Sequence, residues 1–189
     1  MPMRIVCLGD SITAGVSREE SWVALLQRSS SHTWINAGIV GDTAVGMLCR
    51  LQDCIRHHRP DMLIWLGGVN DILLTGSRDL PVSCTMAAVH QCVAAGVLPV
   101  VGIPYSIADV PGFSICHDGA AEALTGYQQW LRSLCSTYHL RCVDFGPAFE
   151  GHREFLQADG LHPNGQGNRV MAQCVRKCAF FREDCHVLD

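Results

Sequence analysis

The stretch Met62-Leu63-Ile64-Trp65-Leu66 is an unbroken run of apolar residues that ends at Gly67-Gly68. A strand covered by helices on both faces is apolar throughout rather than alternating, and this run has that pattern. The sequence therefore predicts a buried strand of a parallel sheet here. Other apolar stretches of strand length occur at residues 4–8, 33–37, 97–103 and 140–145.

Helical patterns separate these strands. Residues 43–58 carry apolar side chains at spacings of three and four, which is typical of an amphipathic helix. Five strands separated by helices predict an α/β fold with a mostly parallel sheet covered on both faces. Longer loops are expected at residues 67–80 and 104–119. Further helices are expected at residues 19–28, 81–95, 120–138 and 164–180.

The composition is that of a globular protein. Of the 189 residues 48% are hydrophobic and 17% charged, so we expect one domain over residues 1–189 rather than a disordered chain. The formal net charge is -4 and the basic residues are scattered, which argues against nucleic acid as a partner. No apolar run is long enough for a transmembrane segment, and residues 1–4 leave no room for a signal peptide. We therefore expect a cytoplasmic protein.

The sequence contains eleven cysteines, most of them within apolar segments, such as Cys7 and Cys92. Buried free thiols behave as small hydrophobic groups, and we interpret these cysteines in that way. A zinc site near the C-terminus is the alternative, but its residues lack the usual C-x-x-C pair. The residues concerned are Cys174, Cys178, Cys185 and His186.

Gly9-Asp10-Ser11 follows the first predicted strand. Ligands of open parallel sheets bind at the carboxyl ends of the strands, which is where this serine lies. A serine on a strand-to-helix turn can have a base and backbone amides beside it, the two things a hydroxyl needs to act as a nucleophile. Taken alone, the segment also fits an ordinary turn with a helix cap.

Asp159-Gly160-Leu161-His162 precedes the last predicted helix. An aspartate three residues before a histidine, across a glycine, can fold back to accept the imidazole proton. This contact fixes the tautomer and leaves the other ring nitrogen free to face a hydroxyl. A loop with a helix cap is again the alternative for this segment alone.

Two more strand ends carry possible hydrogen-bond donors to an anion. The backbone amide of Gly41 and the side-chain amide of Asn70 follow the second and third strands. Four unrelated turns have little reason to gather a nucleophile, a base, its acid and two donors at one sheet edge. Together they predict an acyl-transfer site. The neighbouring Asp10 and Asp71 are expected to brace these loops through hydrogen bonds to backbone amides.

The four segments, in this order between residues 9 and 162, resemble the sequence blocks of the SGNH hydrolases, also called the GDSL-type esterase and lipase family. The resemblance covers nearly the whole chain. The segment around Gly41 and the short loops are most similar to the compact thioesterase and lysophospholipase branch. Ile12 departs from the family's first block, which usually has leucine after the serine, and this apolar exchange alters no catalytic group.

The resemblance implies a flavodoxin-like, three-layer α/β/α sandwich. It also implies hydrolysis of carboxylic esters or thioesters of small to medium acyl groups through an acyl-enzyme, without metal or cofactor. Ser11 would be the nucleophile, His162 its base and Asp159 the acid that orients the base. The oxyanion hole would consist of the backbone amides of Ser11 and Gly41 and the side chain of Asn70.

The expected partner is a small-molecule ester. Tyr105, Ile107, Val110 and Phe113 are candidates for lining an acyl pocket, with simple loop packing as the alternative. A carbohydrate O-acetyl esterase is the competing enzymatic function. A non-catalytic small-ligand binding module is the alternative of another class, and it would be expected to lack the nucleophile, the base or an oxyanion donor.

Overall fold

Five parallel strands form one sheet in a computed structural model that describes residues 1–15, 17, 20–107 and 117–181. The strand order is β2-β1-β3-β4-β5, which confirms the predicted parallel sheet. The bounds are β1 (Arg4–Gly9), β2 (Thr33–Gly38), β3 (Met62–Leu66), β4 (Leu98–Ile103) and β5 (Arg141–Asp144).

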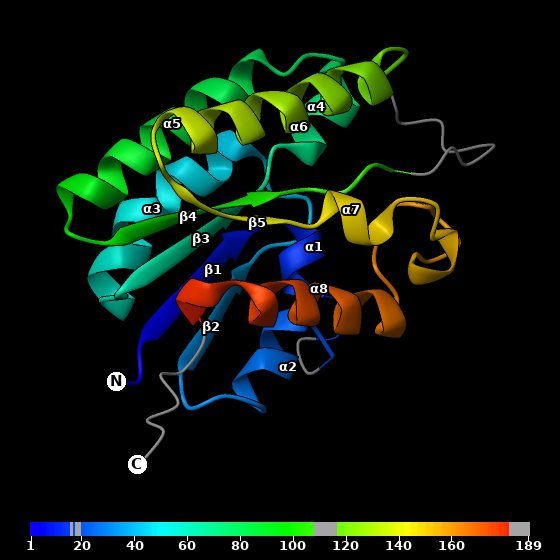
Figure 1. The fold of residues 1–189 in the computed structure, drawn as a ribbon. Coiled ribbons are helices and arrows are strands. Elements are labelled where there is room, and N and C mark those ends of the chain that lie inside the picture. The colour runs from blue at the N-terminus through cyan, green and yellow to red at the C-terminus, as the bar shows by residue number, and fades with distance from the viewer. Residues whose placement is uncertain (16, 18–19, 108–116, 182–189) are drawn as a thin grey trace.

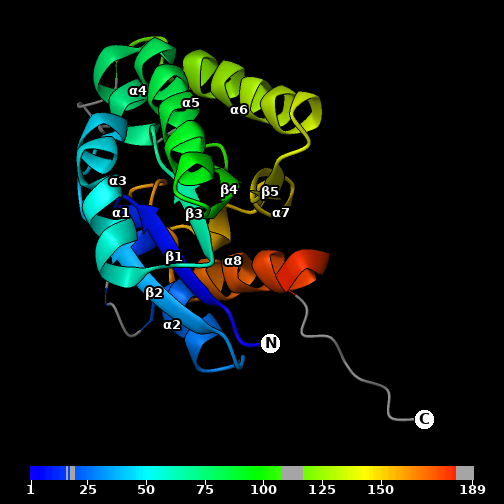
Figure 2. The same cartoon turned by 90° about the vertical axis from the view of Figure 1, so that its left-hand side faces the viewer.

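Helices cover both faces of this sheet and give the expected three layers. Figure 1 shows α3, α5 and α6 on one face and α2 and α8 on the other, and the turned view in Figure 2 agrees. The helices are α1 (Ser11–Ala14), α2 (Trp22–Gln27), α3 (Ala44–His58), α4 (Val69–Thr75), α5 (Asp79–Ala94), α6 (Ala120–Thr137), α7 (Gly146–Phe149) and α8 (Gly165–Lys177), with short 3-10 helices η1 (Arg153–Phe155) and η2 (Ala179–Phe181).

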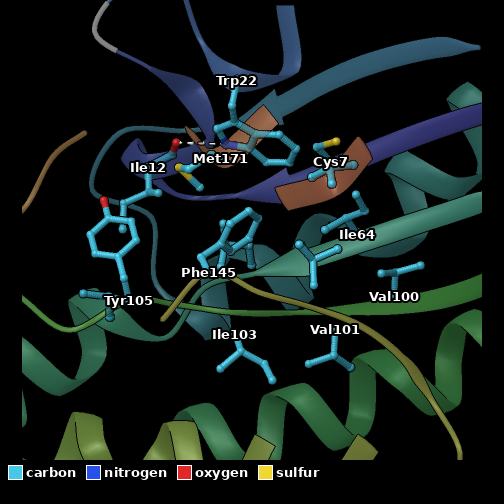
Figure 3. Packing of buried hydrophobic residues seen from close by; sticks show 14 of the residues in the cluster. Cys7, Ile12, Trp22, Ile64, Val100, Val101, Ile103, Tyr105, Phe145 and Met171 are labelled. Carbon is cyan, nitrogen blue, oxygen red and sulfur yellow. Dashed lines mark hydrogen bonds between the residues drawn. The ribbon is translucent and has the colours of Figure 1, made fainter. Parts of the chain in front are cut away.

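Alternate residues of β1 and β3 enter different parts of the core. In β1, Val6 and Leu8 pack with α3 and α5, whereas Cys7 packs with Trp22 of α2 and Met171 of α8. Figure 3 shows Cys7, Trp22 and Met171 close to one another above the sheet. Both sides of the strand are therefore shielded from water, which is why its sequence is apolar without alternation.

The segment 67–80, which we predicted to be a loop, contains the helix α4. Gly68 and Gly76 bound it with φ angles of 97° and 66°, a left-handed conformation that glycine adopts without a steric penalty. Its apolar face is buried, with Ile72 fully inside the core. The sequence prediction was wrong because seven residues between glycines are too short for the periodic pattern to stand out.

Other elements differ from prediction mainly at their ends. Helix α5 begins at Asp79 instead of residue 81, and α8 ends at Lys177 instead of residue 180. Gly165 is the first residue of α8 because Asn164 caps it, its side chain accepting from two backbone amides. No helix within the described ranges combines the length and hydropathy needed to cross a bilayer.

The strand order places the carboxyl ends of β1, β2 and β3 side by side. The chain runs from β1 to β2 on one side and then returns to β3 on the other side of β1. Such a reversal separates the loops that follow the two flanking strands, and open α/β sheets bind ligands at this point. The segments that begin at Ser11, Gly41 and Asn70 follow these three strand ends.

Candidate active site

Ser11 is held in a tight turn between β1 and α1. The Asp10 carboxyl oxygen Oδ1 accepts a hydrogen bond from the Ile12 amide at 2.9 Å, which caps the helix. The Ile12 carbonyl accepts from the Trp22 indole at 3.2 Å (Figure 3). The Ile12 side chain is itself buried, so the residue after the serine anchors the turn in the core.

The same turn lies directly against the neighbouring strand. A Cβ atom at Gly38 would stand 2.2 Å from the backbone nitrogen of Ala14, far inside a normal contact distance. Glycine at this position of β2 therefore allows α1 to approach the sheet closely. Ser11 keeps 9% of its surface exposed and lines a small cavity.

The side chains of Ser11, His162 and Asp159 form a continuous chain of hydrogen bonds. The Ser11 Oγ lies 2.8 Å from Nε2 of His162, and Nδ1 of His162 lies 2.7 Å from Oδ2 of Asp159. Since an ionised carboxylate only accepts, Nδ1 carries the proton and Nε2 accepts from the serine hydroxyl. The imidazole is thus in the tautomer that can take a proton from Ser11.

Asp159 also fixes the loop that carries His162. Its Oδ1 accepts from the backbone amides of Leu161 at 2.9 Å and of His162 at 3.0 Å. Burial alone would raise the pKa of Asp159, but the hydrogen bonds from the His162 ring and from these two amides outweigh burial and hold its pKa below the usual range. The carboxylate is therefore ionised at neutral pH.

Tyr105 is buried and supports the loop of residues 159–162, so it does not line an open pocket. Its hydroxyl donates to the Leu161 carbonyl at 2.9 Å, and its ring stacks on Phe149 with centroids 4.0 Å apart. Only 1% of Tyr105 is exposed. Ile107 lines a separate cavity between α6 and α7. The other two candidates for the acyl pocket, Val110 and Phe113, lie outside the described residues.

The candidate oxyanion donors lie on the segments that follow β2 and β3. Gly41 has a φ of 75°, and a Cβ there would meet no atom within 4 Å, so the space beside its α-carbon is open. The Asn70 side-chain nitrogen donates to the Asp42 carbonyl at 2.8 Å and keeps a second N–H for a ligand. Among the described residues, the backbone amides of Ser11 and Gly41 donate to no other group.

Asp71 ties the two donor loops together. Its Oδ2 accepts from the Ala44 amide at 2.8 Å, at the start of α3. Burial raises the pKa of Asp71, and this backbone hydrogen bond opposes the rise. The prediction that Asp10 and Asp71 brace the loops through backbone amides is confirmed.

Arg50 is a positioning residue that the sequence analysis missed. Its guanidinium donates to the Ala37 carbonyl at 2.7 Å, to the Gly9 carbonyl at 3.0 Å and to the Asp42 carboxylate at 2.8 Å. It thereby joins the ends of β1 and β2 to the loop of Gly41. One signal was available, because Arg50 lies three residues after the buried Met47 and so interrupts the apolar face of α3.

A serine hydroxyl bonded to an imidazole that a carboxylate orients is the arrangement of serine hydrolases. Comparison with known proteins agrees with this class. The sequence profile of the GDSL-like Lipase/Acylhydrolase family matches residues 7–170. Esterase TesA of Pseudomonas aeruginosa is 35% identical over 167 residues, which cover 84% of this chain and 79% of TesA.

Two further proteins are similar. An arylesterase of Vibrio mimicus is 37% identical over 85 residues, a match that spans only 40% of that protein and 41% of this chain. The crystal structure of a lipase/acylhydrolase from Enterococcus faecalis has a TM-score of 0.76 and 26% identity, with 93% of each chain covered. The chain belongs to the GDSL-like lipase/acylhydrolase family, and it is accordingly a carboxylic ester hydrolase.

Proposed function

We propose that the chain hydrolyses carboxylic esters of small to medium acyl groups, with Ser11 as nucleophile and His162 and Asp159 as its base and orienting acid. The observation that carries this assignment is the pair of hydrogen bonds that joins the three side chains, at 2.8 Å and 2.7 Å. Both distances are those of well-formed hydrogen bonds, so the hydroxyl proton has a ready acceptor.

In the acylation step, Ser11 Oγ forms a bond to the ester carbonyl carbon while its proton moves to Nε2 of His162. The negative charge on the carbonyl oxygen is met by the amides of Ser11 and Gly41 and by the Asn70 side chain. As the bond to the leaving oxygen breaks, His162 gives the proton to that oxygen, and an alcohol departs.

Deacylation repeats these steps with water as the nucleophile. Water gives a proton to Nε2 of His162 as it attacks the acyl carbon, and the same proton returns to Ser11 Oγ when the carboxylic acid leaves. Asp159 stabilises the imidazolium in both halves of the reaction without itself taking up the proton. No group beyond these side chains and amides is needed.

The experiment that tests this function is hydrolysis of a graded series of 4-nitrophenyl esters, from acetate to dodecanoate, by the wild type and by Ser11→Ala. We expect turnover that is highest for the shorter chains and absent in the variant. Equal turnover by both proteins would remove Ser11 from the mechanism. A maximum at the longest chain would refute the proposed acyl size.

A further inference from the structure

A small cavity lies beside Ser11, and the proposed reaction steps do not involve it. Its volume is about 170 Å³. The candidate oxyanion donors Gly41 and Asn70 are not among the residues that line it, whereas His162 is. The cavity therefore adjoins both Ser11 and His162, and Val40, the residue before Gly41, also lines it. The lining residues are Ser11, Gly15, Val40, Gln157, His162 and Pro163.

The positions of the oxyanion donors and of His162 determine which part of an ester occupies this cavity. In the tetrahedral intermediate the former carbonyl carbon bears Ser11 Oγ, the oxyanion, the leaving oxygen and the acyl carbon. The oxyanion faces the donor amides, and the leaving oxygen has to lie within hydrogen-bond reach of Nε2 of His162, which protonates it. The substituent on the His162 side is therefore the leaving group.

We propose that this leaving-group cavity binds the alcohol portion of the substrate and selects for a compact, uncharged alcohol. The inference rests on the proposed function and deepens it. The apolar lining residues are Val40, which is 73% exposed, and the buried Pro163, and Gln157 is a polar neighbour. Among the six lining residues, all of which the structure describes, His162 is the only titratable one.

The size of the cavity sets the size of the group that it can hold. Pockets that enclose drug-sized ligands measure roughly 300–1,000 Å³. A cavity of about 170 Å³ suits a short alkyl or single aryl group, and the remainder of a larger alcohol would extend past Val40 into water. Selection should therefore depend on the volume of the side chain at position 40.

The test is kcat/KM for two acetate esters, phenyl acetate and 2-naphthyl acetate, whose leaving groups are of similar acidity but different size. Both esters form the same acetyl-enzyme, so their difference reports acylation alone. The proteins compared are the wild type, Val40→Ala, Val40→Phe and the control Val45→Ala. Val45 is also exposed and lies four residues after Gly41 in the sequence, but it does not line the cavity.

We expect the wild type to prefer phenyl acetate. Val40→Ala should raise the naphthyl-to-phenyl ratio by about tenfold, the lower end of the effect of one methylene group in an apolar pocket, because Val40 is largely exposed. Val40→Phe should lower the ratio, and Val45→Ala should leave it unchanged. A second series of phenyl esters, from acetate to hexanoate, varies only the acyl chain. All four proteins should show the same preference for acyl length in this series.

Two outcomes would overturn the proposal while the proposed function stands. One is a naphthyl-to-phenyl ratio that is equal in the wild type and both Val40 variants. The other is an acyl-length preference that changes in those variants, which would place the acyl chain in the cavity. Absence of any turnover in the folded wild type would instead overturn the proposed function, and this inference with it.

Discussion

Nε2 of His162 lies 2.8 Å from the Ser11 hydroxyl, although 151 positions separate the two residues in the chain. Ser11 is placed by β1, and His162 by the loop that precedes α8. Helix α8 packs against α2, and the Asn168 side chain in α8 accepts from the Trp22 amide at 2.9 Å. The Trp22 indole in turn donates a hydrogen bond to the carbonyl of Ile12, the residue after Ser11. The contacts that hold α8 against α2 therefore also connect to the turn that carries Ser11.

Asp159→Asn should inactivate the enzyme while leaving the fold intact. Asparagine keeps an oxygen for the Leu161 and His162 amides, but it turns an N–H₂ group toward Nδ1 of His162 and favours the wrong tautomer. The expected loss of kcat is about 10⁴-fold. Steady-state kinetics and urea unfolding of the same preparation check both halves of the prediction. A folded variant within tenfold of the wild-type kcat would show that Asp159 does not orient the base.

Asn70→Ala should raise the reaction barrier by about 2.7–4 kcal/mol if its amide meets the oxyanion. The lost hydrogen bond to the Asp42 carbonyl should lower the free energy of unfolding by only about 1 kcal/mol. Leu74→Ala is the matched control, because Leu74 lies in the same helix with its side chain exposed. Unchanged kcat with reduced stability would make Asn70 a purely structural residue.

Arg50→Lys should lower both stability and activity. A lysine cannot reproduce the fork of donors that reaches the Gly9 and Ala37 carbonyls and the Asp42 carboxylate. We expect a loss of about 1–3 kcal/mol in the free energy of unfolding and a lower kcat, because the Gly41 loop loses its anchor.

Arg56→Lys is the control for this substitution, since the exposed pair of Arg56 and Asp53 on the same helix should contribute little. Denaturant unfolding and ester kinetics measure the two effects. Identical behaviour of the two lysine variants would contradict the role of Arg50.

Asp10 should give the protein a recognisable dependence of stability on pH. Burial raises the pKa of Asp10 to about 7, although the hydrogen bond from the Ile12 amide opposes the rise. An unfolded aspartate has a pKa of about 4, so between about pH 4 and pH 7 the folded state holds a proton that the unfolded state has released. This contribution to stability is present at low pH and is lost as the pH rises to about 7.

Asp10→Asn removes this titration and keeps an oxygen for the Ile12 amide. The wild type should lose stability relative to the variant between pH 5 and pH 8, by up to about 1.4 kcal/mol for each unit that separates the folded and unfolded pKa values. Urea unfolding of both proteins at the two pH values gives this difference. A difference that stays constant, or that changes in favour of the wild type, would contradict a protonated Asp10.

The sheet was predictable because its strands are apolar on both faces, as in the run from Met62 to Leu66. The site was predictable in outline because parallel strands end at one edge and each end carries a distinctive residue. Arg50 escaped prediction because it contacts backbone carbonyls such as that of Gly9, which no sequence motif marks. Tyr105 was named as a pocket candidate with packing as the alternative, and its hydrogen bond to the Leu161 carbonyl favours packing. One domain over residues 1–189, a cytoplasmic location and the thioesterase and lysophospholipase branch stay predictions.

The central claim is that Ser11 is a nucleophile activated by His162, and intact-protein mass after treatment with a fluorophosphonate tests it most directly. We predict a single adduct on the wild type, none on Ser11→Ala, and much slower labelling of His162→Ala. An adduct on Ser11→Ala, or no adduct on folded wild-type protein, would contradict the assignment.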